Sequence, residues 1–284
     1  MSGAVSTQKH WKASDVRLFD EDVTSNPNTI NIESIVVEQI PVSRAVALQP
    51  RMSKAIWRPA PGRKLAFMIR HEEDLLGVAF LASPVINMGA RDQALGLSKD
   101  PSEKGRQLRE YADLSVCVPA QPFGWYWNGG KMVALLATTF GDYWRERYGD
   151  DLKGIVTTSL WGRGSQYNRV YKFLGYTKGY GHLHITDEQY HEMLSWMRAN
   201  SVEIPSSRFG SGSNPRMRRI QAYSRASGDK SFTLQHGQKR GIYYHDAVAP
   251  ENRLEMLKLW YERWGKPRFD RKKNEQPPYW DGLT

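Results

Sequence analysis

The hydrophobic positions of this 284-residue chain repeat with two different periods, and each period predicts a kind of element. Alternation with a period of two, or a short apolar run between polar turns, predicts a β-strand. Such patterns place strands at residues 32–40, 65–69, 75–81, 111–118, 152–159 and 241–244. The second and third of these should form an antiparallel hairpin, because a short charged turn separates them.

Apolar residues spaced three and four apart predict helices between and after these strands. Helices are expected at residues 131–147, 187–199 and 254–264, and a short helix carrying Tyr167, Val170, Tyr171 and Leu174 is expected to end at Gly175. Thr186 and Gln189 have the spacing of a capping box, which places the start of the helix at 187–199. Residues 91–109 are read as a polar loop. Strands interleaved with helices predict an α/β (α+β) fold with a central mixed sheet flanked by helices.

The texture of the chain changes after Asn200, where Ser, Gly and Arg dominate. A stretch of this composition buries little apolar surface and reads as a linker or a phosphate-facing loop. We therefore expect three parts: an N-terminal segment at 1–60, separate or packed on the core; a core at 61–200; and a basic C-terminal extension at 201–284.

The charge of the chain points to a polyanionic partner. The formal net charge is +10, and residues 201–284 hold sixteen Lys and Arg against nine Asp and Glu. Neutralising phosphates releases condensed counterions, so DNA or RNA is the expected partner, with a solubility device or an anionic lipid surface as alternatives. The single cysteine, the lack of a signal-peptide pattern at the start and the short apolar runs predict a cytoplasmic protein that does not enter a membrane.

A glycine turn before the helix at 131–147 is the first candidate site. It consists of Asn128, Gly129, Gly130 and Lys131, and the free backbone N–H groups of a helix start can hold an anion. The turn is not a Walker loop, because Trp125 stands where the first glycine belongs and Met132 where Ser or Thr belongs. A plain tight turn with an asparagine N-cap is the alternative.

Two further candidates combine polar, cationic and aromatic side chains. The stretch from Ser159 to Tyr176 places Arg163, Tyr167 and Asn168 near the end of a strand, where ligands bind in open α/β sheets. In the last part of the chain, cations alternate with aromatics, which suits phosphate contacts and base stacking, although a solvated face is the alternative. The residues expected to contact nucleic acid there are Arg216, Arg218, Arg219, Arg225, Lys239, Arg240 and Tyr243.

The patterns of metal sites and of common enzymes are missing from the sequence. His182, His184, Asp187 and His191 are close in sequence, but no HExxH or CxxC accompanies them, so no metal site is predicted. Cys117 lies on a predicted strand and reads as a buried, inert thiol. There is no GxSxG and no GxGxxG, which removes the main support for a hydrolase or a dehydrogenase.

The order of elements from Tyr111 to Tyr176 resembles the core of the GNAT N-acyltransferase fold, and Tyr171-Lys-Phe-Leu-Gly-Tyr176 looks like the end of a late helix in that family. In GNAT proteins a central strand splays from its neighbour, and the helix after it holds the cofactor pyrophosphate. The resemblance implies acyl-CoA or another anionic acyl donor at residues 128–131. Of the family's pyrophosphate pattern, Gly130 is the position that matches.

A second resemblance covers most of the chain after Lys64. Leu76-Gly-Val-Ala-Phe-Leu-Ala-Ser-Pro84, Ala90-Arg-Asp92, Leu95-Gly-Leu-Ser98 and His236-Gly-Gln-Lys-Arg-Gly-Ile-Tyr243 are similar to the DUF4338 family, which includes DruA of the Druantia anti-phage system and phage relatives. The stretch from Arg163 to Tyr171 resembles a turn in Mom-type phage proteins, which have a GNAT-like fold and modify adenine in DNA.

These resemblances imply a phage-related or anti-phage protein that acts on DNA in a bacterial host and has partners in a defence system. The candidate catalytic positions are Asp92, Ser159, Arg163, Tyr167 and Asn168, and Asp92 or Asp113 could accept a proton from a base. Three functions stay open: a transferase that modifies a nucleic-acid base, a non-catalytic DNA-binding subunit, and an ordinary N-acyltransferase.

Overall fold

A computed structural model of the chain describes residues 12–18, 30–53, 57, 62–179, 185–207, 215–229 and 237–277. Its strands are β1 (Arg17–Leu18), β2 (Ile35–Ile40), β3 (Lys64–His71), β4 (Asp74–Ala82), β5 (Tyr111–Pro119), β6 (Gly154–Ser159), β7 (Lys172–Tyr176) and β8 (Gly241–Asp246). All eight belong to one mixed sheet, in the order β2-β3-β4-β5-β6-β8-β7 with β1 paired to β4. The predicted α/β architecture with a central mixed sheet is confirmed.

The helices of the described residues lie between the strands and after the last strand in the chain. They are α2 (Val42–Met52), α3 (Gly89–Ala94), α4 (Pro101–Gln107), α5 (Phe123–Trp127), α6 (Gly129–Ala137), α7 (Gly141–Tyr148), α8 (Asp187–Ala199), α9 (Pro215–Ser227), α10 (Arg253–Trp260) and α11 (Lys266–Lys272). A π-helical turn at Tyr261–Gly265 joins α10 to α11, and 3-10 turns occur at Ala13–Asp15, Ile32–Ser34, Leu108–Glu110, Gly162–Gly164 and Pro250–Asn252.

The sheet is antiparallel except at two places, β1 with β4 and β5 with β6. The parallel pairing of β5 with β6 covers three positions, from Tyr111 opposite Gly154 to Asp113 opposite Val156. Beyond them the two strands have different partners: β5 continues along β4, and β6 continues along β8. The two central strands therefore diverge toward their carboxyl ends.

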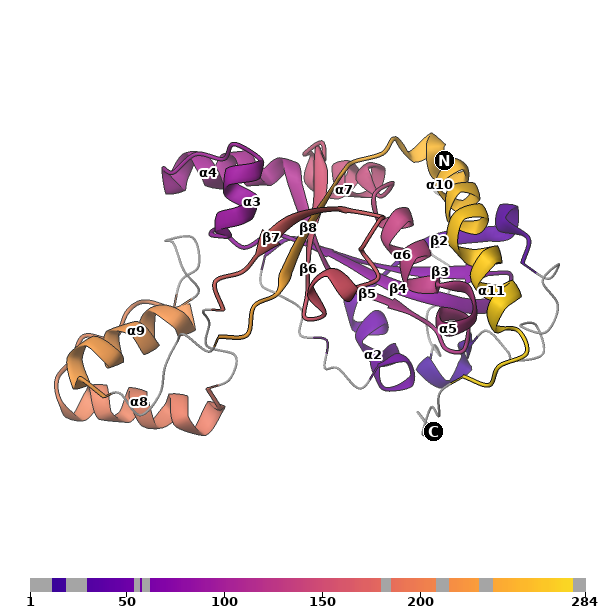
Figure 1. Ribbon diagram of the computed structural model, residues 1–284. Coiled ribbons are helices and arrows are strands. Elements are labelled where there is room, and N and C mark those ends of the chain that lie inside the picture. The colour runs from indigo at the N-terminus through magenta and orange to yellow at the C-terminus, as the bar shows by residue number, and fades with distance from the viewer. Residues whose placement is uncertain are drawn as a thin grey trace, which may run out of the picture.

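The two faces of the sheet carry separate apolar cores. The larger core lies under α5, α6, α7, α10 and α11 and contains Trp127, Phe140, Trp144 and Trp260, all fully buried. The smaller core on the other face is covered by α2, whose Leu48 and Met52 pack near Phe80 and Trp57. Figure 1 shows α10 and α11 running beside α6 and α5. Burial of large aromatics at roughly 25 cal/mol per Å² is the main stabilising contribution to such a layered core.

The α8–α9 hairpin stands away from the sheet, between β7 and β8 in the chain (Figure 1). It has a small apolar cluster of its own, formed by Ile185, Met193 and Ile220. The chain then returns to the sheet as β8, which pairs with both β6 and β7. Residues 241–272 thus belong to the same sheet and core as residues 62–176, and the core continues past the boundary expected at residue 200.

Several local predictions are corrected by the structure. The short helix predicted to carry Tyr167, Val170, Tyr171 and Leu174 is instead a series of turns followed by β7, because residues 172–176 form a ladder with β8, a strand far away in the sequence. The helix predicted over 131–147 breaks into α6 and α7, where the hydroxyls of Thr138 and Thr139 donate to carbonyls three residues back. The polar loop at 91–109 contains α3 and α4. The capping box of Thr186 and Gln189 is confirmed.

Candidate nucleic-acid interface

A tight turn after β6 presents side chains at the end of the sheet where β6, β8 and β7 meet. Ser159, the last residue of β6, lies opposite Gly241, and Gly241 lies opposite Tyr176 of β7. The Tyr243 hydroxyl donates to the Gly162 carbonyl oxygen at 2.6 Å, which fixes the turn to the core. Gly162 has a φ of 50°, a backbone conformation that glycine adopts without strain. The turn is therefore held in one place relative to the three strand ends.

The surface around this turn is aromatic and apolar. The Trp161 side chain is 82% exposed, Leu160 is 54% exposed and Tyr176 is 48% exposed. Tyr176 lies against the turn, because a Cβ built on Gly162 would be 3.2 Å from the Tyr176 ring. The exposed Arg163 lies over the Phe173 ring, 4.8 Å from its centroid. An exposed apolar group with a cationic rim is typical of a binding surface.

The two stretches of chain that form the turn and the strands beside it carry only positive charges between them. No Asp or Glu occurs from residue 152 to residue 186, a stretch that holds five Lys and Arg, or from residue 230 to residue 245, which holds three. Six of these eight cations have exposed side chains. Lys153 pairs with Glu110, whereas Arg163, Arg169, Lys172 and Lys239 form no ion pair with a described residue. A surface formed by such cationic stretches attracts polyanions.

Other residues predicted for this site lie inside the protein. Tyr167 is buried, and desolvation raises the pKa of its phenol well above the ordinary value. Tyr243 is fully buried, with its ring 5.6 Å from that of Tyr167, so it belongs to the core rather than to a surface for nucleic acid. Ser159 is buried and accepts a hydrogen bond from the Trp161 N–H at 3.2 Å. Asn168 is exposed, and its carbonyl oxygen accepts a hydrogen bond from Lys131 at 2.6 Å.

The glycine turn at the start of α6 is covered by the chain itself. A Cβ on Gly130 would collide with the side chain of Gln166, whose Nε2 donates to the Cys117 carbonyl oxygen at 2.8 Å. A Cβ on Gly129 would collide with the Phe123 ring. These side chains fill the space in which the predicted pyrophosphate would lie, so an anionic acyl donor does not fit the turn as it is arranged here. The two glycines serve close packing.

Side chains from the C-terminal helices and from the turn itself complete this arrangement. The Trp260 indole N–H donates to the Trp127 and Asn128 carbonyl oxygens, and Asn128 Nδ2 donates to the Trp264 carbonyl oxygen at 3.3 Å. Lys131 Nζ donates to the Gln166 carbonyl oxygen at 2.9 Å. Desolvation, with a smaller contribution from Arg169, lowers the pKa of Lys131 to about 8. Lys131 thus ties the 166–168 segment to α6.

Two carboxylates lie in different settings on and beside α3. Asp92 receives hydrogen bonds from the fully buried Arg91 and from Lys104, whose Nζ is 3.0 Å from Oδ2. Desolvation raises the pKa of Asp92, but these hydrogen bonds outweigh it, so the pKa is lowered. Desolvation also raises the pKa of Asp113 on β5, to about 7, although Arg91 and Arg240 oppose this shift. Asp92 is therefore held in ion pairs with Arg91 and Lys104, and Asp113 is the carboxyl group whose pKa is close to neutral pH.

The arginines predicted for nucleic-acid contact on α9 divide into two groups. Arg216 pairs with Asp187 and donates to the carbonyl oxygens of Ile185 and Thr186. Arg218 and Arg219 donate to the carbonyl oxygens of Ser206 and Pro205, each at 2.9 Å. These three hold the α8–α9 hairpin together, because each joins α9 to a segment that precedes it. Arg225 and, outside the hairpin, Lys239 are exposed, and Arg240 is half-buried.

The described residues contain no group of three or more His, Cys, Asp or Glu side chains placed to bind a metal, and His182 and His184 lie outside the described residues. Desolvation raises the pKa of the buried Cys117 thiol to about 12, so this thiol stays protonated and unreactive. None of the described helices combines the length and apolar character needed to cross a membrane.

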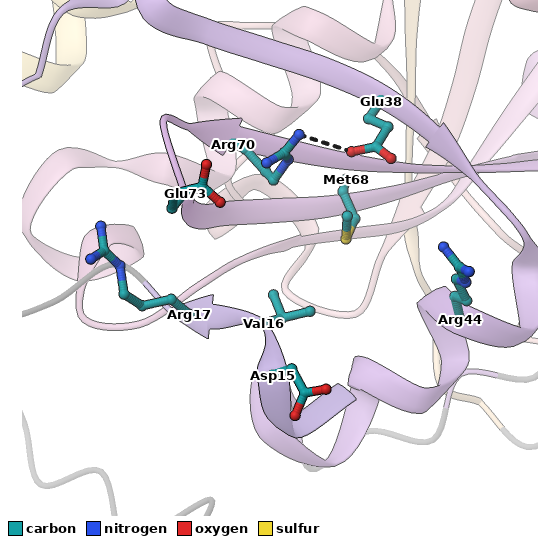
Figure 2. A pocket seen from close by; sticks show the side chains of 8 residues that line it. All are labelled: Asp15, Val16, Arg17, Glu38, Arg44, Met68, Arg70 and Glu73. Carbon is teal, nitrogen blue, oxygen red and sulfur yellow. Dashed lines mark ion pairs between the residues drawn. The ribbon is translucent and has the colours of Figure 1, made fainter. Parts of the chain in front are cut away.

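A hollow of about 410 Å³ lies at the edge of the sheet near β1 and β2 (Figure 2). Arginines and carboxylates line it in equal number, and Arg70 pairs with Glu38 at 3.1 Å. The lining residues are Asp15, Val16, Arg17, Glu38, Arg44, Met68, Arg70 and Glu73. Because its charges balance, this hollow is a poorer site for a polyanion than the turn after β6.

Sequence reasoning missed the residues that dominate this surface. Leu160, Trp161 and Tyr176 were not among the predicted site residues, although Arg163 between them was. The sequence did contain an indication of this surface. Trp161 lies in a glycine-rich turn two residues before Arg163, and a side chain in such a turn is rarely part of a hydrophobic core. What could not be read was the approach of Tyr176, because it depends on the pairing of β7 with β8.

Comparisons with known proteins agree on one family. The family described as Druantia protein DruA matches residues 56–258. Druantia protein DruA of Escherichia coli (strain UMEA 4076-1) is 29% identical over 206 residues, which cover 64% of this chain and 50% of that protein. The chain therefore spans about half the length of this relative.

Among solved structures, a crystal structure of malonyl-CoA decarboxylase from Cupriavidus metallidurans covers 84% of this chain and 67% of its own, with 12% identity and a TM-score of 0.31. A likeness at this level carries no argument about fold or activity. The sequence matches do carry one, because the family match extends from before β3 into α10. The chain belongs to the Druantia protein DruA family.

Proposed function

We propose that this chain is a nucleic-acid-binding component of an anti-phage defence system. The anti-phage role follows from its family, and the binding role rests on the structure. The observation that carries it is the turn after β6, where Arg163 and Trp161 are exposed and where the stretches 152–186 and 230–245 contain cations and no Asp or Glu. Phosphate neutralisation by such side chains supplies affinity without sequence preference.

The arrangement of the sheet supports the GNAT-like character predicted for the core. One parallel pair, β5 and β6, lies at the centre of an otherwise antiparallel path, and its strands diverge after three residue pairs. The space that a donor would need at the start of α6 is filled by Gln166 and Phe123. We therefore favour a scaffold that binds nucleic acid over a transferase that modifies a base. The likeness to Mom-type proteins stays a prediction, as does the presence of protein partners.

The salt dependence of DNA binding tests this proposal. The full chain is titrated against labelled DNA by fluorescence anisotropy over a series of salt concentrations, and the logarithm of the affinity should fall linearly with the logarithm of the salt concentration. Arg163→Glu and Lys239→Glu should each weaken binding and reduce the salt slope by about 1. Arg145→Glu is the matched control, since Arg145 is exposed and pairs with Asp151, before the start of β6.

Two results would count against the proposal. Affinity that does not change with salt would show that phosphate contacts are not made. Equal effects of Arg163→Glu and Arg145→Glu would move the interface away from the turn after β6. Mass spectrometry of nucleosides from a host that expresses the chain decides about the transferase: a new modified base that disappears in an Arg163→Ala variant would favour catalysis.

A further inference from the structure

We propose that Trp161 and Tyr176, flanked by Arg163, form a stacking platform for unpaired bases, so that the chain binds single-stranded nucleic acid in preference to duplex. This inference rests on the proposed function, because it assumes that nucleic acid binds at the turn after β6. It adds the substrate class and the residues that select it.

The Trp161 indole is unusually exposed. Trp161 is 82% exposed, whereas the other tryptophans that the structure describes are buried or half-buried. An indole in water forgoes the stabilisation that its burial would give the fold. Nothing in the packing of the turn requires an aromatic side chain at this position, because the Trp161 backbone makes the local hydrogen bonds.

The indole is displayed by a fixed backbone. The Trp161 N–H donates to Ser159 Oγ at 3.2 Å, and its carbonyl oxygen accepts from the Gly164 N–H at 2.9 Å. The next residue, Gly162, is anchored by the Tyr243 hydroxyl. A ring on such a turn loses little conformational freedom when a base stacks on it, which favours binding.

The second exposed ring of the platform belongs to Tyr176. Tyr176 is 48% exposed and is held edge-on against Phe173, with ring centroids 5.1 Å apart and an interplanar angle of 72°. Arg163 also lies over Phe173, so a cation and a second exposed ring occur at the same strand ends. Two exposed aromatic side chains on one turn and the strand beside it, together with a guanidinium, suit successive bases and the phosphates that link them.

The exposed indole and the charge around it favour a single strand as the ligand. The faces of bases in a duplex are covered by their neighbours, so an exposed indole can stack only on an unpaired or extruded base. A protein partner could also cover an aromatic patch, but the surrounding stretches contain cations and no carboxylates, which is complementary to a polyanion. Charge complementarity therefore favours a single strand.

The test compares single-stranded and duplex oligonucleotides of equal length, measured by anisotropy with the full chain at one salt concentration. Trp161→Ala should weaken binding of labelled oligothymidylate by about 5- to 100-fold, in line with the loss of one base–aromatic stack. Trp161→Phe should retain most of the affinity for the single strand. The duplex affinity of Trp161→Ala should differ from that of wild type by less than about 2-fold. Val36→Ala is the matched control, because Val36 is 52% exposed on β2, which lies at the opposite end of the strand order from β7.

Each outcome separates this inference from the function on which it rests. If wild type binds neither oligonucleotide, both fail. Suppose that wild type binds both oligonucleotides and that Arg163→Glu weakens the binding of both. If Trp161→Ala then binds the single strand as tightly as wild type does, the stacking platform is wrong and the binding function stands. Equal losses for single strand and duplex in Trp161→Ala would also overturn the platform. Circular dichroism melting of each variant checks the fold, which the exposed Trp161 side chain should not affect.

Discussion

The contact between Gly130 and Gln166 gives a sharp prediction about the start of α6. In Gly130→Ala, the new methyl group would collide with the Gln166 side chain. Overpacking of this kind costs about 1–3 kcal/mol, and the higher helix propensity of alanine returns at most about 1 kcal/mol. Displacing Gln166 also weakens its hydrogen bond to the Cys117 carbonyl oxygen. The variant should therefore be about 1–2 kcal/mol less stable than wild type in urea denaturation.

A double-mutant cycle shows whether the cost comes from this one contact. In a Gln166→Ala background the collision is absent, so Gly130→Ala should be neutral or stabilising, and the coupling energy should be about 1–3 kcal/mol. The control is Gly105→Ala within α4, where a Cβ meets no atom within 4 Å and should stabilise the protein by up to about 1 kcal/mol. Additive effects of the two changes, or a Gly130→Ala variant as stable as wild type, would refute the filled helix start.

Two further predictions concern the charges beside α3. The pKa of Asp113 is raised from 3.8 to about 7, so the folded state retains its proton more strongly; the resulting stability is fully present below pH 4 and is lost as the pH rises through 7. Relative to Asp113→Asn, wild type should lose at most about 1.4 kcal/mol per pH unit over this window, measured by urea denaturation, and parallel curves would contradict the shift. Arg91→Met removes a fully buried guanidinium that holds Asp92 and should lower the free energy of unfolding by about 3 kcal/mol or more. Arg106→Met, at an exposed site, should lower it by less than about 0.5 kcal/mol. Similar losses of stability in the two variants would contradict this reasoning.

The limits of sequence reasoning are visible in β7 and its surroundings. Tyr167, Val170, Tyr171 and Leu174 have helical spacing, yet the segment is a turn and a strand, because hydrogen bonds to β8 outweigh local propensity. The same pairing brings Tyr176 to the turn that carries Trp161. Tyr167 was predicted for this turn and Tyr243 for the C-terminal extension, and both side chains are buried. A pattern of residues does not tell which side of a strand end faces solvent.

By itself, the sequence determined the α/β class, six of the strands, the capped helix at 187–199 and the excess of positive charge, since each depends on local periodicity or on composition. Only the tertiary structure decided that Gln166 fills the start of α6, that Asp92 is tied into ion pairs, and that the Trp161 indole is exposed. These features depend on contacts between residues far apart in the chain, and the free energy of such contacts is set by packing and desolvation rather than by neighbouring residues.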